Sequence, residues 1–186
     1  MNILHIESCA LGDRSPSRQH TAAIVAQLAH AHEVTSLKYR DLLAAPLTHV
    51  TGPLLQAMSK QWNAAIPMHP DLRAEVLLSA ALLQEFTESD VVVVGAPMDN
   101  YFAPSALKVW LDRLLHLSDA RDSACLAEVR VLLVTSERSD DGIAPRPMAS
   151  HASLLRNYEE QLAAAFTCLG VRQLEFARNA EFADLP

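Results

Sequence analysis

Three serine hydroxyls, those of Ser8, Ser15 and Ser17, lie between an apolar run at residues 2–6 and a helical pattern that begins near Ser17. Hydroxyl groups donate hydrogen bonds, and the first turn of a helix offers free backbone N–H groups and a partial positive charge. This combination favours a phosphate site. The alternative is that Ser15 or Ser17 only caps the helix. The segment matches neither GxxxxGK[ST] nor GxGxxG, so neither nucleotide fingerprint is indicated.

The charge balance limits the classes of partner. A formal net charge of −7 and a pI near 5.5 argue against a nucleic-acid or anionic-membrane partner, because both favour a basic surface. A local basic pocket is still compatible with this charge. Arg14 and Arg18, beside the serines, either strengthen an anion site or are solvated.

The cysteine and histidine spacings predict no metal site. Cys9, Cys125 and Cys168 are scattered, which is typical of reduced cytosolic thiols rather than of a disulfide framework. His30 and His32 form a local HxH that is better explained as a frayed helix end. No cleavable signal is visible, and the apolar stretches are too short to cross a bilayer. We therefore expect a cytoplasmic protein.

Strands and helices alternate along the chain, and the 186 residues suffice for one domain, expected to span residues 1–186. Four consecutive valines at 91–94 indicate a strand that is buried on both faces, as in a parallel sheet covered by helices. The alternation predicts an α/β, doubly wound parallel sheet with right-handed crossovers. Strands are predicted at 2–6, 33–39, 90–97, 129–136 and 171–177, and helices from about 17, around 53–64, and over 72–83, 107–115 and 155–169.

Ligands of such sheets bind beyond the carboxyl ends of the strands. Three loops are therefore candidate site segments: 7–17, 96–104 and 135–147. The second loop carries the most specific pattern, "GAPMDNYFAPSALKVWLDRL". This run resembles the A-P-M-[aromatic]-N-[aromatic]-x-x-P-S-x-L-K-x-[aromatic]-x-D pattern of FMN-dependent NADH-azoreductases, which belong to the NAD(P)H quinone-reductase branch of the flavodoxin-like proteins. The matching positions are Ala96, Pro97, Met98, Asn100, Tyr101, Pro104, Ser105, Leu107, Lys108, Trp110 and Asp112.

Two further segments share the resemblance. Ser8, Cys9, Ser15 and Ser17 fit the family's S-[SC]-x(n)-S-x-S, and "YRDLLAAPLTHV" resembles the family's segment after its second strand. The resemblance covers most of residues 2–136. It implies a flavodoxin-like fold with a five-stranded parallel sheet in the order 2-1-3-4-5 and with helices on both faces.

The resemblance also implies a cofactor and a reaction. The phosphate of FMN is expected at Ser8, Ser15 and Ser17, and its ring along the second loop with a contribution from the third. The ring-binding residues are then Pro97, Met98, Asp99, Asn100, Tyr101 and Ser136. Family members transfer two electrons from NADH or NADPH through the flavin to a quinone or azo compound, and they form homodimers. The flavin carries the chemistry, so no catalytic side chain is expected.

The sequence departs from the family pattern in several places. The third loop is TSERSD at 135–140 where the family has T-S-R-G-G, so two glycines are replaced and two carboxylates are added. The 116–128 segment lacks the family's aromatic and glycine residues, and Asp99 replaces an aromatic residue. Only residues 179–186 follow the last strand where the family has a terminal helix, so one sheet face needs the first helix or a partner subunit as its cover.

These departures leave alternatives open. A flavodoxin-fold relative that has lost flavin turnover and acts as a binding or assembly protein is favoured by the altered third loop. The intact 96–113 run favours the reductase. A one-electron flavodoxin carrier fits less well, because the resemblance is to two-electron reductases.

Overall fold

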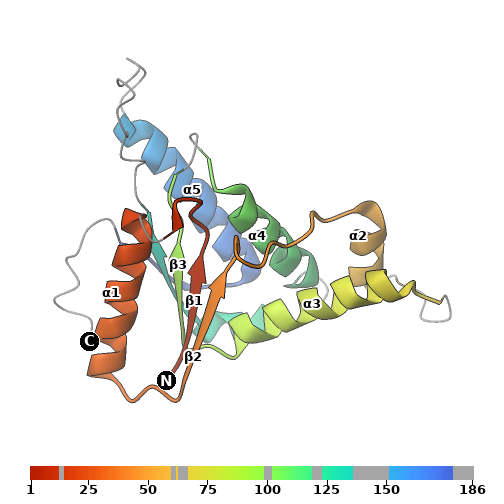
Figure 1. The fold of residues 1–186 in the computed structure, drawn as a ribbon, viewed down its shortest axis with the longest axis horizontal. Helices are drawn as coiled ribbons and strands as arrows, with labels where there is room; N and C mark the ends of the chain where they lie inside the picture. The colour runs from red at the N-terminus through yellow and green to blue at the C-terminus, as the bar shows by residue number, and fades with distance from the viewer. Residues whose placement is uncertain are drawn as a thin grey trace.

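The computed structural model describes residues 1–12, 15–59, 62, 67–98, 102–118, 123–135 and 151–177, with the backbone alone at 123–125 and 151–152. Within these ranges the chain alternates between strands and helices, as predicted (Figure 1). The strands are β1 (Asn2–Glu7), β2 (Ser36–Asp41), β3 (Val91–Gly95), β4 (Arg130–Val134) and β5 (Gln173–Ala177). The helices are α1 (Pro16–Ala31), α2 (Gly52–Met58), α3 (Pro70–Thr87), α4 (Ser105–Ser118), a 3₁₀ helix η2 (Ser123–Glu128) and α5 (His151–Leu169).

All five strands form one sheet in the order β2-β1-β3-β4-β5, and every neighbouring pair is parallel. This confirms the strand order that the resemblance implies. The valines of β3 are buried on both faces, in agreement with the central position of that strand. Glu7 pairs with Asp41 on one side and with Gly95 on the other, and Gly95 pairs with Val134. The carboxyl ends of four strands therefore meet at one edge.

Helices cover both faces of the sheet, as expected. In Figure 1, α1 lies on one face, while α3, α4 and α5 lie on the other. The larger core belongs to the three-helix face and is centred on Phe86, Trp110 and Phe166, whose rings lie 6.0 to 6.5 Å apart. On the other face, Ile24, Val25 and Leu28 of α1 pack against alternate residues of β1, β3 and β4.

The first helix supplies the cover that the sequence left open. Leu132 and Val134 of β4 point to the α1 face and are fully buried there. Beyond them, β5 presents Gln173 and Glu175, both exposed. The part of this face that lies farthest from α1 is therefore polar.

Two predicted elements have bounds that differ clearly from those of the structure. The strand predicted at 33–39 is Ser36–Asp41, because the residues before it bond with the chain's first residue: Met1 N donates to Glu33 O at 2.8 Å, and Thr35 N donates to Met1 O at 2.9 Å. The helix predicted around 53–64 ends at Met58 in α2. Within the described residues, no helix is both long and apolar enough to cross a membrane.

Candidate functional site

The amino end of α1 carries two of the three predicted phosphate-binding serines. Ser15 is the N-cap and Pro16 takes the first helical position, where its missing N–H is no loss. The Oγ atoms of Ser15 and Ser17 lie 2.8 Å apart, and Arg18 N donates to Ser15 Oγ at 3.4 Å. The capping role of Ser15 is thus confirmed, while its role toward a phosphate stays a prediction.

This hydroxyl pair retains the capacity to bind an anion. Two hydroxyls carry two protons, and the bond between Ser15 and Ser17 uses one of them whichever oxygen donates. Among the described residues no acceptor takes the other proton, so it is left for an incoming acceptor. Both residues are buried, with 1% and 0% of their surface exposed, so neighbouring residues must move aside to admit a phosphate. On these observations, the residues present fit a phosphate group.

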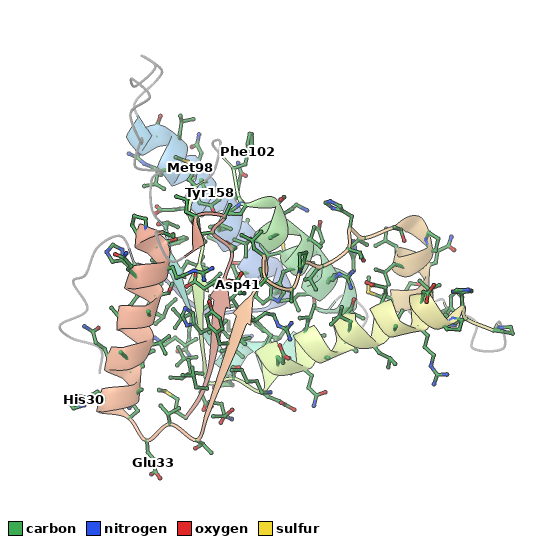
Figure 2. All side chains as sticks on the ribbon, viewed as in Figure 1. His30, Glu33, Asp41, Met98, Phe102 and Tyr158 are labelled. Atoms are coloured by element: carbon green, nitrogen blue, oxygen red, sulfur yellow. The ribbon has the colours of Figure 1, made fainter. Side chains whose placement is uncertain are left out.

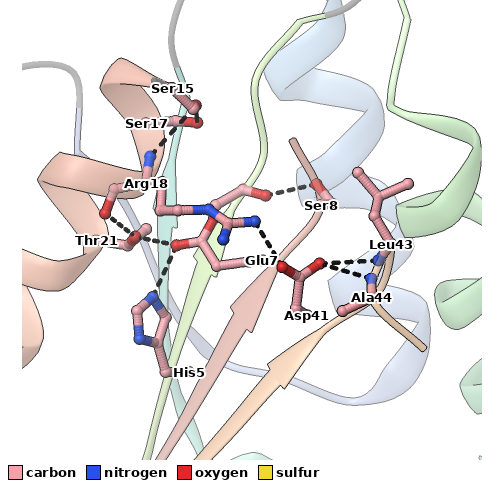
Figure 3. A network of polar contacts seen from close by, with 11 residues as sticks. His5, Glu7, Ser8, Ser15, Ser17, Arg18, Thr21, Asp41, Leu43 and Ala44 are labelled. Carbon is pink, nitrogen blue, oxygen red and sulfur yellow. Dashed lines mark hydrogen bonds and ion pairs between the residues drawn. The ribbon is translucent and has the colours of Figure 1, made fainter. Parts of the chain in front are cut away.

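The third predicted serine has a different role in the structure. Ser8 Oγ donates to Gly95 O at 2.6 Å and lies apart from the Ser15–Ser17 pair (Figure 3). The bond joins the ends of β1 and β3, two adjacent strands of the sheet. Because its one proton is already bound, Ser8 reaches a phosphate only by giving up this strand contact.

A buried acidic cluster lies directly below the serines, and the sequence did not predict it. Glu7 is fully buried at the end of β1, and its Oε1 lies 2.8 Å from His5 Nε2 and within hydrogen-bond distance of Thr21 Oγ1 (Figure 3). Among the described residues, Glu7 Oε2 has no hydrogen-bond partner. It faces Gly95, where a Cβ atom would lie 2.6 Å from it. The glycine therefore makes room for the carboxylate.

Arg18 balances this acidic cluster. Its Nη2 lies 2.7 Å from Asp41 Oδ2 at the end of β2. Burial alone would raise the pKa of Asp41, but the N–H groups of Leu43 and Ala44 and the guanidinium of Arg18 outweigh burial and lower that pKa. Burial likewise opposes the charge of Arg18, yet the bond to Asp41 and the nearby negative groups raise its pKa. Arg18 is therefore neither solvated nor free for an anion, which answers the question left open by the sequence.

Of the second loop, residues 96–98 and 102–104 are described, and the first part contacts α5. Tyr158 OH lies 3.2 Å from Ala96 O and 3.4 Å from Pro97 O, and Figure 2 shows Tyr158 close to Met98 at the carboxyl end of the sheet. Burial, with a smaller contribution from the charge of Glu159, raises the pKa of Tyr158. The hydroxyl therefore keeps its proton and remains a donor.

The third loop begins with a second contact to α5. Thr135 Oγ1 donates to Glu159 Oε1 at 2.8 Å, next to Tyr158 on the helix. The remaining predicted site residues, Asp99, Asn100, Tyr101 and Ser136, lie outside the described residues, as does Arg14.

Sequence reasoning did not select the residues that hold the site together. His5, Thr21, Tyr158 and Glu159 occur at apolar or helical spacing, where they resemble ordinary core or surface positions. One signal was available: a tyrosine on the apolar face of a helix needs a partner for its hydroxyl, and the carboxyl end of the sheet provides carbonyls.

Comparison with known proteins gives consistent results. The family model described as flavodoxin-like fold matches residues 1–183. A curated FMN-dependent NADH:quinone oxidoreductase from Methylocella silvestris is 40% identical over 183 residues, covering 96% of this chain and 86% of the relative. One of the same name from Sinorhizobium medicae is 34% identical, covering 96% of this chain and 84% of that protein.

Solved structures agree on the fold. The FMN-dependent NADH-azoreductase from Bacillus anthracis, solved in complex with FMN, superposes with a TM-score of 0.75 at 17% identity, over 96% of this chain and 86% of that one. An azoreductase from the Sterne strain of Bacillus anthracis superposes with a TM-score of 0.75 at 16% identity. The match covers 95% of this chain and 85% of that one. The chain therefore belongs to the flavodoxin-like fold family and, within it, to the family of FMN-dependent NADH:quinone oxidoreductases.

Proposed function

We propose that this protein is an FMN-dependent oxidoreductase that transfers two electrons from NADH to a quinone or azo compound. The observation that carries the proposal is the 40% identity over 96% of the chain to a relative named FMN-dependent NADH:quinone oxidoreductase. The hydroxyl pair at the amino end of α1 supports it, because a retained proton and a helix N-terminus are suited to the phosphate of FMN. NADPH is a second possible donor.

Bound FMN supplies the hydride and electron-transfer chemistry, so the role of the chain's residues is to bind and orient the cofactor. Ser15 and Ser17 bind the phosphate. Ser8 contributes to this phosphate site through its bond to Gly95 O, which joins the ends of β1 and β3. Pro97 and Met98 border the ring. Asp99, Asn100, Tyr101 and Ser136 complete the ring site in this proposal.

The chain is proposed to act as a cytoplasmic homodimer of single-domain subunits spanning 1–186. The dimer follows from the family resemblance. The formal charge of −7 supports the absence of nucleic-acid and membrane partners. Sedimentation over a concentration series tests the dimer: a mass of twice 20.4 kDa is expected, and a monomer at every concentration contradicts it.

The test of the reaction has two steps. Purified protein is mixed with FMN and desalted, and retained flavin absorbance shows binding. The loaded protein is then mixed anaerobically with NADH, which should bleach the flavin bands, and a quinone or an azo dye should restore them. Protein that holds no FMN contradicts the proposal. Protein that holds FMN but is not bleached by NADH or NADPH favours the non-catalytic binding protein.

A further inference from the structure

Tyr158 of α5 contacts the loop that borders the proposed ring site. Its hydroxyl is buried and lies within hydrogen-bond distance of two successive carbonyls, Ala96 O at 3.2 Å and Pro97 O at 3.4 Å. A tyrosine hydroxyl has one proton, so the two carbonyls share a single donor. Both carbonyls are thereby turned toward α5.

The orientation of a carbonyl fixes the orientation of the next amide. In a planar trans peptide, the C=O of one residue and the N–H of the next point in opposite directions. The peptide between Pro97 and Met98 directs its C=O at Tyr158, so Met98 N–H points away from α5. Within the described ranges, this N–H has no hydrogen-bond acceptor. Ala96 N already donates to Val134 O at 2.9 Å and Pro97 has no N–H, so among the described residues Met98 offers the first unbonded amide beyond β3.

We propose that Tyr158 is a positioning residue for the flavin: by holding the Pro97 carbonyl inward, it turns the Met98 amide toward the ring. The inference rests on the proposed function. The raised pKa of Tyr158 supports it, because burial keeps the hydroxyl protonated and therefore a donor. The neighbouring Glu159 bonds Thr135 at the end of β4, so α5 contacts both loops that border the proposed ring site.

The test compares Tyr158→Phe with the wild type in two quantities, the affinity for flavin and the two-electron reduction potential of the bound flavin. The variant removes one oxygen and keeps the buried ring. The dissociation constants of FMN and of riboflavin should both rise about tenfold, because the contact concerns the ring and not the phosphate. At saturating FMN, the two-electron potential should become more negative, because a donor N–H that faces the ring stabilises the electron-rich reduced flavin. A purely structural role would lower the melting temperature and leave the potential of bound flavin unchanged.

Tyr39→Phe is the matched control, since it removes the same atom from an exposed tyrosine on β2. Amide exchange of Met98 in the wild type adds a measurement that does not depend on how the variant folds. Saturation with FMN or with riboflavin should slow this exchange. Unchanged exchange, or unchanged affinity and potential in Tyr158→Phe, overturns the inference while the proposed function stands. A wild type that binds no flavin overturns both.

Discussion

At the scale of single residues, the carboxyl end of β1 brings opposing charges close together beneath a site proposed for an anion. Glu7 and Asp41 are both acidic, and Arg18 lies beside them with His5 and Thr21 nearby. The hydroxyl pair of α1 lies above this group (Figure 3). Within the described part of the chain, phosphate binding is therefore expected to depend on local hydrogen bonds rather than on an excess of positive charge.

The first prediction concerns the hydroxyl pair. Replacing both Ser15 and Ser17 with Ala should raise the dissociation constant of FMN by about 10- to 100-fold, because the one available hydroxyl proton makes a hydrogen bond to a charged group, worth about 1.5–3 kcal/mol. Riboflavin lacks the phosphate and should change by less than about twofold. Fluorescence titration of both ligands measures the ratio. The control is Ser89→Ala, which removes the hydroxyl of a buried serine between α3 and β3. Equal weakening of the two ligands would place the phosphate elsewhere.

The second prediction concerns the charge of Asp41. Its side-chain oxygen also accepts from Leu43 N and Ala44 N, a role that an asparagine oxygen can fill, so Asp41→Asn removes the charge and keeps the turn. The folded-state pKa of Asp41 is lowered, so its contribution is complete above the unfolded value near 3.9 and is lost as the pH falls through the folded value. The variant should be less stable by about 1 kcal/mol at pH 7, and the difference should begin to fall below about pH 4 and be lost as the pH passes the lowered folded-state pKa.

Urea unfolding of both proteins between about pH 3 and pH 7 measures this difference. Glu160→Gln neutralises an exposed carboxylate in the middle of α5 in the same way and should have no such effect. A difference in stability that stays constant with pH would mean that the charge of Asp41 does not contribute.

At the scale of elements, one arginine joins three segments on the larger core's side. Arg113 of α4 is fully buried, and its guanidinium contacts Thr48 O at 2.8 Å, Ser79 Oγ at 2.9 Å and the carboxylate of Glu75. Thr48 belongs to the segment after β2, and Ser79 and Glu75 belong to α3. The connection between β2 and β3 is therefore held against α4.

The third prediction follows from this contact. Arg113→Met keeps the apolar stem and removes the guanidinium, so the Thr48 carbonyl loses this donor and Glu75 loses its charged partner while still accepting from Thr48 Oγ1. The free energy of unfolding should fall by about 2–4 kcal/mol, a little less than the loss of about 3–5 kcal/mol when one partner of a fully buried pair is removed, because the Glu75 side chain is partly exposed. Urea unfolding measures it, with Arg73→Met on the exposed side of α3 as control. A loss equal to that of the control would show that the contact adds no stability.

Elements were easier to predict from the sequence than the site. The valines of β3 and the apolar spacing in α4 and α5 identify buried strands and amphipathic helices, because burial acts on whole runs of residues. The start of β2 was missed because Met1, distant in the sequence, bonds with Glu33 and Thr35. Such contacts leave no periodic pattern.

Within the site, the local features could be predicted and the long-range ones could not. A serine before a proline at the start of a helix predicts that Ser15 is the N-cap, and the structure confirms this role. The bond from Ser8 to Gly95 and the bond from Tyr158 to Ala96 join residues 87 and 62 positions apart. Sequence spacing carries no information about which carbonyl such a hydroxyl meets.

At the scale of the whole molecule, the two cores share one sheet. Val92 and Val94 point to the three-helix core, while Val91 and Val93 of the same strand point to the α1 core. Neither core can lose its packing without exposing β3. The two faces are therefore expected to unfold together.

The fourth prediction is a single unfolding transition. Trp110 lies in the larger core and reports on that face, so a Trp62→Phe background isolates its fluorescence from that of the second tryptophan. Fluorescence and far-ultraviolet circular dichroism should give coincident urea midpoints, as two-state domains do. Midpoints that separate would contradict a single-domain chain.

The side chain of Glu7 fills the space beside Gly95, so the residues tolerated at these two positions depend on each other. Gly95→Ala places a methyl group against Glu7 Oε2, and the contacts of this carboxylate with His5 and Thr21 keep it from moving away. Shortening residue 7 by Glu7→Ser removes the clash, so Gly95→Ala should cost less in that background than in the wild type. A double-mutant cycle measures this epistasis. Over evolutionary time, a descendant of this chain can replace the glycine only after the glutamate has been replaced, which fixes the order of the two substitutions.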